Sequence, residues 1–253
     1  MKKIFLGLLF ISSFCLAAKA QNNNNTQPKK PDYSKIDLSN RPNDHLLIQF
    51  GYDGWDNQNG GDSINPTGFS RHFNMYFMLD KPFKSNPHFS VGFGAGIGSS
   101  NIFFKDTYID LKANSNTLPF RPSVPNTNSA NFKKYKLTTV FAEIPVEFRY
   151  AGNPVNPNKG FKASIGAKIG TLLDAHTKGK NLVDQTGVSV YGSKYINKEK
   201  DKRFINGTRL AVTARVGYGI FSLDASYQVT SFLKDGAGPT IRPYSIGLTI
   251  SGL

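Results

Sequence analysis

The sequence predicts an eight-stranded, antiparallel, up-and-down transmembrane β-barrel, an all-β fold. Three observations lead to this fold class: eight stretches that alternate apolar and polar residues, connections that are short and long in turn, and a leader typical of export. Side chains of a strand point to opposite faces with a period of two, so each stretch has one apolar face. A tilted strand crosses a bilayer in about ten residues. The chain is therefore expected to cross a membrane with strands.

The N-terminus, residues 1–20, has the composition of a cleavable signal peptide. Lys2 and Lys3 precede an apolar stretch, and Ala18-Lys19-Ala20 is a small-x-small cleavage site. A short membrane anchor is the alternative, but no stop-transfer pattern follows. The single cysteine, Cys15, lies in this leader, so the mature chain forms no disulfide and no thiolate metal site.

The rest of the chain is divided into a polar tail and a barrel domain. Residues 21–44 contain few apolar side chains and are expected to form a disordered periplasmic tail. The barrel domain is expected over residues 45–253. Loss of the three leader lysines lowers the formal net charge from +14 to +11. Export argues against nucleic acid as a partner, so we expect the basic surplus to face anionic lipopolysaccharide or to keep the loops solvated.

The first four expected strands each present alternate apolar residues on one face. They are His45–Tyr52 (apolar at 46, 48, 50 and 52), Gly68–Leu79 (apolar at 69, 73, 75, 77 and 79, interrupted by Arg71), Phe89–Ile97 (every odd position, with glycine or serine between) and Leu137–Tyr150 (even positions from 140 to 150).

The last four follow the same pattern. They are Phe161–Leu173 (odd positions, with threonine at 171), Thr208–Tyr218 (even positions from 210), Phe221–Val229 (odd positions) and Tyr244–Ile250 (even positions).

The connections differ in length according to their side of the barrel. The second, fourth and sixth strands are followed by the short links 80–87, 151–160 and 219–220, whereas residues 99–134 and 174–207 form long connections. Short periplasmic turns and long outer loops are the rule for outer-membrane barrels. This alternation predicts that both termini are periplasmic.

Three short motifs resemble the PorT-type outer-membrane β-barrel domain family of the Bacteroidota. They are Glu143-Ile144-Pro145-Val146-Glu147, the glycine-rich stretch 89–98, and Gly160-Phe161-x-Ala163-x-Ile165-Gly166-Ala167. The resemblance covers residues 44–253 and implies an integral outer-membrane location. The family's founding member serves type IX secretion and gliding, so the resemblance also implies a secretion or envelope role. Leu253 departs from the aromatic C-terminal residue usual in such chains.

Charged residues occupy inward positions of the expected strands. An eight-stranded barrel is just wide enough for side chains to fill it, and isolated charges there would be costly. We therefore expect a salt-bridged lumen network, with a charged ion path as the alternative. Pro145, mid-strand, predicts a bulge or a gap in strand pairing. The network is expected to comprise Glu143, Glu147, Arg149, Lys162, Lys168, Arg209, Arg215 and Asp224.

The sequence predicts no catalytic, cofactor or metal site. His72 is the one plausible general base, but no motif identifies a partner serine. The glycines at 92, 94, 96 and 98 do not match a dinucleotide fingerprint and instead free space in the lumen. The acidic stretch 53–62 fails the calcium-loop template.

The predicted function is that of a non-enzymatic interaction or accessory barrel in the outer membrane, in envelope maintenance or protein secretion. Expected partners are outer-membrane lipid, lipopolysaccharide and secretion or envelope proteins, with no cofactor and no nucleic acid. The alternatives are a narrow pore for small solutes, a surface adhesin and, third, an outer-membrane hydrolase that uses His72.

Overall fold

The computed structural model describes residues 36–39, 41, 46–57, 64 and 66–252. The chain divides into two units, Met1–Asp32 and Tyr33–Leu253. The first unit and the expected signal peptide lie outside the described residues, as do His45, Leu253 and most of the expected tail. Within the described residues, no helix is long and apolar enough to span a membrane.

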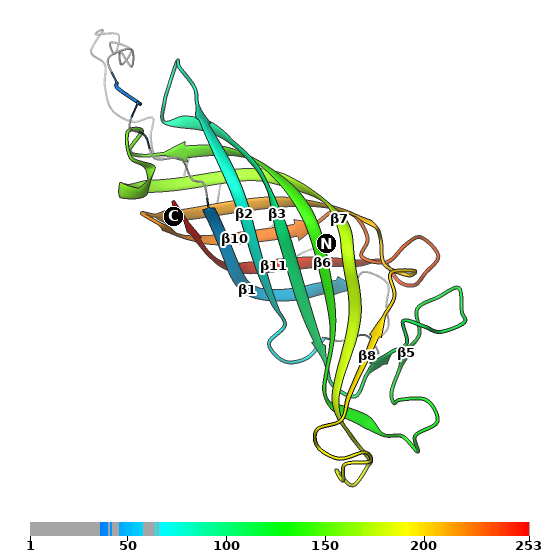
Figure 1. Cartoon of the computed structure of the whole chain (residues 1–253). Coiled ribbons are helices and arrows are strands. Elements are labelled where there is room, and N and C mark those ends of the chain that lie inside the picture. The colour runs from blue at the N-terminus through cyan, green and yellow to red at the C-terminus, as the bar shows by residue number, and fades with distance from the viewer. Residues whose placement is uncertain (1–35, 40, 42–45, 58–63, 65, 253) are drawn as a thin grey trace, which may run out of the picture. The chain divides into compact units, whose positions relative to one another are not determined.

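Eight antiparallel strands close into a ring, so the predicted fold class is confirmed (Figure 1). The sheet runs in the order β6-β3-β2-β1-β11-β10-β9-β7, and β6 pairs with β7 to complete it. The first and last strands, β1 and β11, pair from Leu47 opposite Ser251 to Asn57 opposite Ile241. The ring strands are β1 (Leu46–Asn57), β2 (Arg71–Pro82), β3 (Phe89–Phe104), β6 (Asn131–Ala151), β7 (Phe161–Val183), β9 (Thr208–Tyr218), β10 (Phe221–Gln228) and β11 (Ile241–Ser251).

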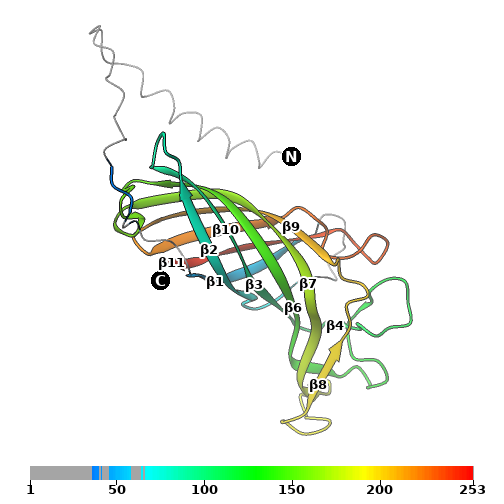
Figure 2. The ribbon, with the colours of Figure 1, turned by 45° about the horizontal axis from the view of Figure 1, so that its top comes forward.

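The expected limits of the two long connections are wrong, because β3, β6 and β7 continue beyond them (Figure 2). The connection expected at 99–134 is reduced to 105–130 and contains a small hairpin of β4 (Tyr108–Ile109) and β5 (Phe120–Arg121). The connection expected at 174–207 contains ten further residues of β7 and the short strand β8 (Ile196–Lys200), which pairs with β7. The sequence criterion sought an outward apolar face, and beyond the membrane the outward residues are polar.

A β-bulge on β7 marks this change of environment. Val140 of β6 pairs with Asp174, whereas Phe141 pairs with Leu172, so Leu173 is the extra residue. A bulge changes which side chains face outward. The odd residues of β7 therefore point outward before Leu173 in the sequence, and the even residues point outward after it. The bulge was not expected at this place.

Pro145 lies at a gap in the β3–β6 ladder. Phe93 pairs with Val146 and Gly96 with Glu143, and no pairing joins the residues between them. Proline has no amide hydrogen to give to a ladder, which accounts for the gap expected here. The β7 side of the strand stays in register, with Pro145 opposite Lys168.

The outward face of the barrel is apolar and rimmed with aromatic rings, as a lipid-facing surface requires. At the end with short turns, Phe89 packs on Phe148 and Tyr150 with ring centroids 5.4 and 5.3 Å apart. Near the other end, Tyr52 contacts Phe69 and Tyr244. Exposed apolar side chains lie between these rims, among them Phe73, Phe77, Ile97, Ile144, Val146, Ile165, Ile169, Val212, Leu223 and Ile246.

The main hydrophobic core lies at the end of the long connections. We call this region the loop cap (residues 102–141, 172–207 and 229–241). Its buried side chains come from all three segments, for example Ile109, Leu137, Leu182, Ile205 and Leu233. Inside the barrel the corresponding cluster is limited to Leu47, Tyr76 and Met78. The long connections therefore form a folded unit with its own core.

Candidate functional site

Glu143 of β6 is at the centre of the lumen network. Its carboxylate pairs with Nζ of Lys168 on β7 and with Nη1 of Arg209 on β9, both at 3.1 Å. The Tyr76 hydroxyl on β2 donates a third hydrogen bond to the same carboxylate. The Glu143 side chain is fully buried, so two cations and a hydroxyl replace the water it has lost.

Glu147 lies four residues further along β6, on the same face, and is also held by two cations. Nη2 of Arg215 approaches its Oε2 to 2.5 Å, and Nε of Arg149 donates to the same oxygen at 2.8 Å. Arg149 also reaches Asp80 on β2 at 3.5 Å. Each glutamate is therefore held between two buried cations, one of them an arginine of β9 and the other a residue of β7 or of β6 itself.

The other two predicted lumen residues are joined to hydroxyl groups. Lys162 donates to Oγ of Ser251 at 2.7 Å, and Thr249 donates to Asp224 at 2.7 Å. Six of the eight predicted residues thus meet in two ion-pair clusters, and two lie beside them. Their common role as a lumen plug remains a proposal.

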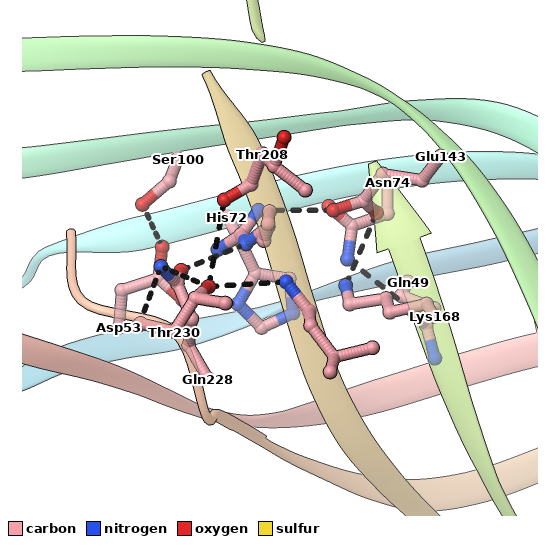
Figure 3. A network of polar contacts seen from close by, with 12 residues as sticks. Gln49, Asp53, His72, Asn74, Ser100, Glu143, Lys168, Thr208, Gln228 and Thr230 are labelled. Carbon is pink, nitrogen blue, oxygen red and sulfur yellow. Dashed lines mark hydrogen bonds and ion pairs between the residues drawn. The ribbon is translucent and has the colours of Figure 1, made fainter. Parts of the chain in front are cut away.

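The sequence interpretation missed the polar residues that connect Asp224 through Thr249 to β1 and β2. Gln49 donates to Thr249 and accepts from Asn74, as Figure 3 shows for the Gln49–Asn74 pair. The signal was present, since all three residues occupy inward positions of alternating stretches, but they are uncharged.

The lumen is filled by these side chains. A cavity of about 20 Å³ lies between Tyr76, Glu147 and Asp224, and another of about 30 Å³ lies at the end with short turns, beside Asp80 and Arg149. A water molecule needs about 10–15 Å³ measured in this way, so each cavity has room for one or two waters.

His72 does not form a catalytic triad with its neighbours. Its Nδ1 lies 2.9 Å from Oδ1 of Asp53, and Ser100 donates to the other oxygen of the same carboxylate (Figure 3). A nucleophilic serine would have to face the second imidazole nitrogen. That nitrogen, Nε2, is buried without a hydrogen-bond partner among the described residues. The hydrogen bonds from Ser100 and His72 to Asp53 hold the three side chains in place, but they do not activate the Ser100 hydroxyl as a nucleophile.

The remaining candidate residues are placed as follows. Asp53 points into the barrel, Asp56 and Asn57 lie at the end of β1, and residues 58–63 are outside the described chain. In the described part, no group of three or more histidine, cysteine, aspartate or glutamate residues is arranged to hold a metal ion. His176 was expected in a loop and lies in β7, paired with Asp174.

Arg41, within the expected tail, is anchored at the end with short turns. Its guanidinium donates to Asp80 at 2.6 Å and to the carbonyls of Pro87 and Pro154 at 3.0 and 2.7 Å. The side chain is 5% exposed. The segment before β1 is therefore attached to two turns at this residue.

The loop cap is held by buried tyrosines as well as by apolar contacts. Tyr135 donates to the carbonyl of Ile109 at 2.8 Å and accepts from its amide, while Tyr108 donates to Glu199 of β8 at 2.5 Å. Burial raises the pKa of both phenols above the ordinary value, so both stay protonated and keep donating. These bonds join β4 to β6 and β8.

Two features of the loop cap are open to solution. The tip patch (Val188, Val190, Tyr191 and Ile196) is apolar, and Val188 and Tyr191 are 62% and 63% exposed. A cleft of about 460 Å³ lies between Asn114–Asn116, Arg203–Phe204 and Lys234–Ala237. Arg203 lies over the Phe204 ring at 4.6 Å and donates to the carbonyl of Ala113, so its guanidinium is fixed at the cleft wall.

Comparisons with known proteins find one family model and several solved structures. The model of the outer membrane protein beta-barrel domain family matches residues 19–233. No curated protein matches. Two solved structures of Ail, the attachment invasion locus protein of Yersinia pestis, are similar, one of them in complex with the heparin analogue sucrose octasulfate. They are 14% and 13% identical, with TM-scores of 0.36 and 0.30, and each match covers 83% of this chain and 99% of that chain.

The family match spans most of the sequence, and the closed antiparallel ring with its apolar outer face is the structure that such a match implies. This chain belongs to the outer membrane protein beta-barrel domain family and is an integral outer-membrane protein.

Proposed function

We propose that this protein is a non-enzymatic interaction protein that presents the loop cap to protein partners outside the cell. The observation that carries the proposal is the hydrophobic core of the loop cap, which makes the long connections a preformed surface. A preformed surface loses less conformational entropy on binding than flexible loops do. The tip patch supplies Tyr191, an exposed aromatic residue of the kind that anchors protein interfaces, surrounded by apolar side chains.

The orientation is part of the proposal. Short turns and both ends of the described barrel lie at one end, and the loop cap lies at the other. Outer-membrane barrels keep short turns in the periplasm and long loops outside. The proposed signal peptide at residues 1–20 and the periplasmic tail, extending to about residue 44, agree with this arrangement.

The resemblance to PorT-type barrels supports a role in protein secretion or envelope maintenance. Among the alternatives, a surface adhesin would use the same loop cap. A narrow pore finds less support, because the ion pairs of Glu143 and Glu147 fill the lumen. A hydrolase finds less support still, because Ser100 is bonded to Asp53 and does not face the free nitrogen of His72.

The experiment is complementation of a strain that lacks the gene. The test variant is Val188→Ser/Tyr191→Ser in the tip patch, and the matched control is Val155→Ser, an exposed apolar residue in a turn at the opposite end. The secreted-protein profile and the adherence of intact cells are measured. We expect the wild type and the control to restore what the deletion removes, and the tip variant to fail although it folds. Full complementation by the tip variant would refute the proposed surface.

A further inference from the structure

The register of β6, β7 and β8 places lysines side by side on the outward face of the loop cap. Lys136 pairs with Lys178, Lys178 pairs with Lys198, and Lys134 pairs with Lys180. We call these five residues the lysine ladder. Directly opposite residues of an antiparallel pair have Cβ atoms about 4.5–5.5 Å apart, and like charges in this arrangement are destabilising. An anionic ligand bound to this face would offset the repulsion between the five lysines.

The protein itself does not neutralise the ladder in the part that the structure describes. Lys136 donates to the neutral amide oxygen of Asn101 at 2.6 Å. Asp174 is the carboxylate on this face, and it is paired with His176 at 2.7 Å and Lys200 at 2.6 Å. Glu199 of β8 turns to the core side, where it accepts from Tyr108.

The positive charge of the lysine ladder affects the pKa of Lys136, one of its residues. Burial lowers the pKa of Lys136 below the ordinary value, and the neighbouring Lys178, Arg71, Lys180 and Lys198 lower it further. Arg71 of β2 extends the basic face, where it lies over the Phe103 ring at 5.3 Å.

The ladder continues the lipid-facing wall. Ile144 and Val146 of β6 are exposed on the apolar band, and the same face leads through Val140 to Lys136. At about 3.3 Å per residue and a tilt near 45°, Lys136 stands roughly 9 Å above Val140. The headgroup layer occupies roughly the first 5–8 Å beyond the hydrocarbon. With Val140 at the edge of the hydrocarbon, the backbone of Lys136 therefore lies just beyond the headgroup layer, and its long side chain can reach back into that layer.

We propose that the lysine ladder binds the phosphate groups of lipopolysaccharide in the outer leaflet around the barrel. Ammonium groups are effective phosphate binders. Each basic residue near an anionic membrane surface adds its own contribution to the binding free energy. The lipid source is favoured over a soluble anion because the ladder lies on the same face as the apolar band and not over the cleft. The inference rests on the proposed orientation and concerns a different surface from the tip patch.

The test uses the full chain in nanodiscs and lipopolysaccharide with a bisphosphorylated lipid A as the probe. The variant Lys136→Gln/Lys178→Gln/Lys198→Gln removes three ladder charges. The matched control, Lys105→Gln/Lys112→Gln/Lys234→Gln, removes three exposed loop lysines. We expect the ladder variant to bind about 100-fold more weakly, since each surface lysine contributes a factor of about five. The control and Lys136→Arg/Lys178→Arg/Lys198→Arg should bind like the wild type.

Three results would overturn the proposal. One is equal binding by the ladder variant and the control. Another is equal binding of dephosphorylated lipopolysaccharide. The third is that the wild-type protein binds a soluble sulfated oligosaccharide through the ladder and does not bind lipopolysaccharide. Removal of repelling lysines should not impair folding, which the gel shift between unboiled and boiled samples checks. The tip variant should keep lipid binding, so failure of the proposed function and failure of this inference are distinguishable.

Discussion

Replacement of Glu143 by glutamine tests the lumen network most directly. The change preserves shape and removes the charge that holds Lys168 and Arg209, which are 4% and 9% exposed. Two cations are then left buried without their counter-ion. Breaking a buried ion pair from one side costs about 3–5 kcal/mol, and we expect the variant to lose that much free energy of unfolding.

The assay is urea titration in detergent micelles, followed by the fluorescence of Trp55, the single tryptophan. With a slope of about 3 kcal/mol/M, the midpoint should fall by about 1–1.7 M. The matched control is Asp235→Asn, which removes an exposed loop carboxylate. Glu143→Gln/Lys168→Met should recover part of the loss, because it also removes one stranded charge. A Glu143→Gln midpoint equal to that of the control would refute the reasoning.

Three further predictions concern the loop cap and the barrel wall. Leu111→Ala, at a fully buried site, should cost about 2–5 kcal/mol and increase hydrogen exchange of the loop cap while the gel shift of the barrel persists. Gly92→Ala would place a Cβ 2.3 Å from Nε of Arg149, so urea denaturation should show a loss of about 1–3 kcal/mol, whereas Gly207→Ala, with open space around it, should show none. The pKa of Lys136 is lowered in the folded state from the ordinary 10.5, so the unfolded chain binds more protons there. Stability should therefore rise as the pH increases through the lowered pKa towards 10.5, and Lys136→Gln should abolish that rise.

The lumen network shows why part of the site could be predicted from sequence. Glu143, Glu147 and Arg215 occupy inward positions of strongly alternating stretches, and a narrow barrel forces buried charges to pair. The partners themselves depend on which strands face each other across the lumen. The pairing of Glu143 with Arg209, and the contact of Tyr76 with both Glu143 and Lys168, could not be obtained from alternation alone.

The loop cap shows the opposite case. Alternation with an apolar outward face ends where the membrane ends, so residues 131–134 and 174–183 were expected in loops, although β6 and β7 continue through them. Above the bulge the apolar side chains face inward and the lysines outward. On β7 the outward position of Lys178 and Lys180 depends on one extra residue at Leu173, which periodicity does not reveal.

The sequence by itself determined the barrel fold of this chain, because a strand that crosses a bilayer needs one apolar face and no unpaired edge. It also determined which charges point into the lumen, since the period of a strand is two. Only the tertiary structure decided the ion-pair partners, the core of the loop cap and the lysine ladder. These arise from cross-strand register and from contacts between distant connections. The spacing of residues along one strand determines neither.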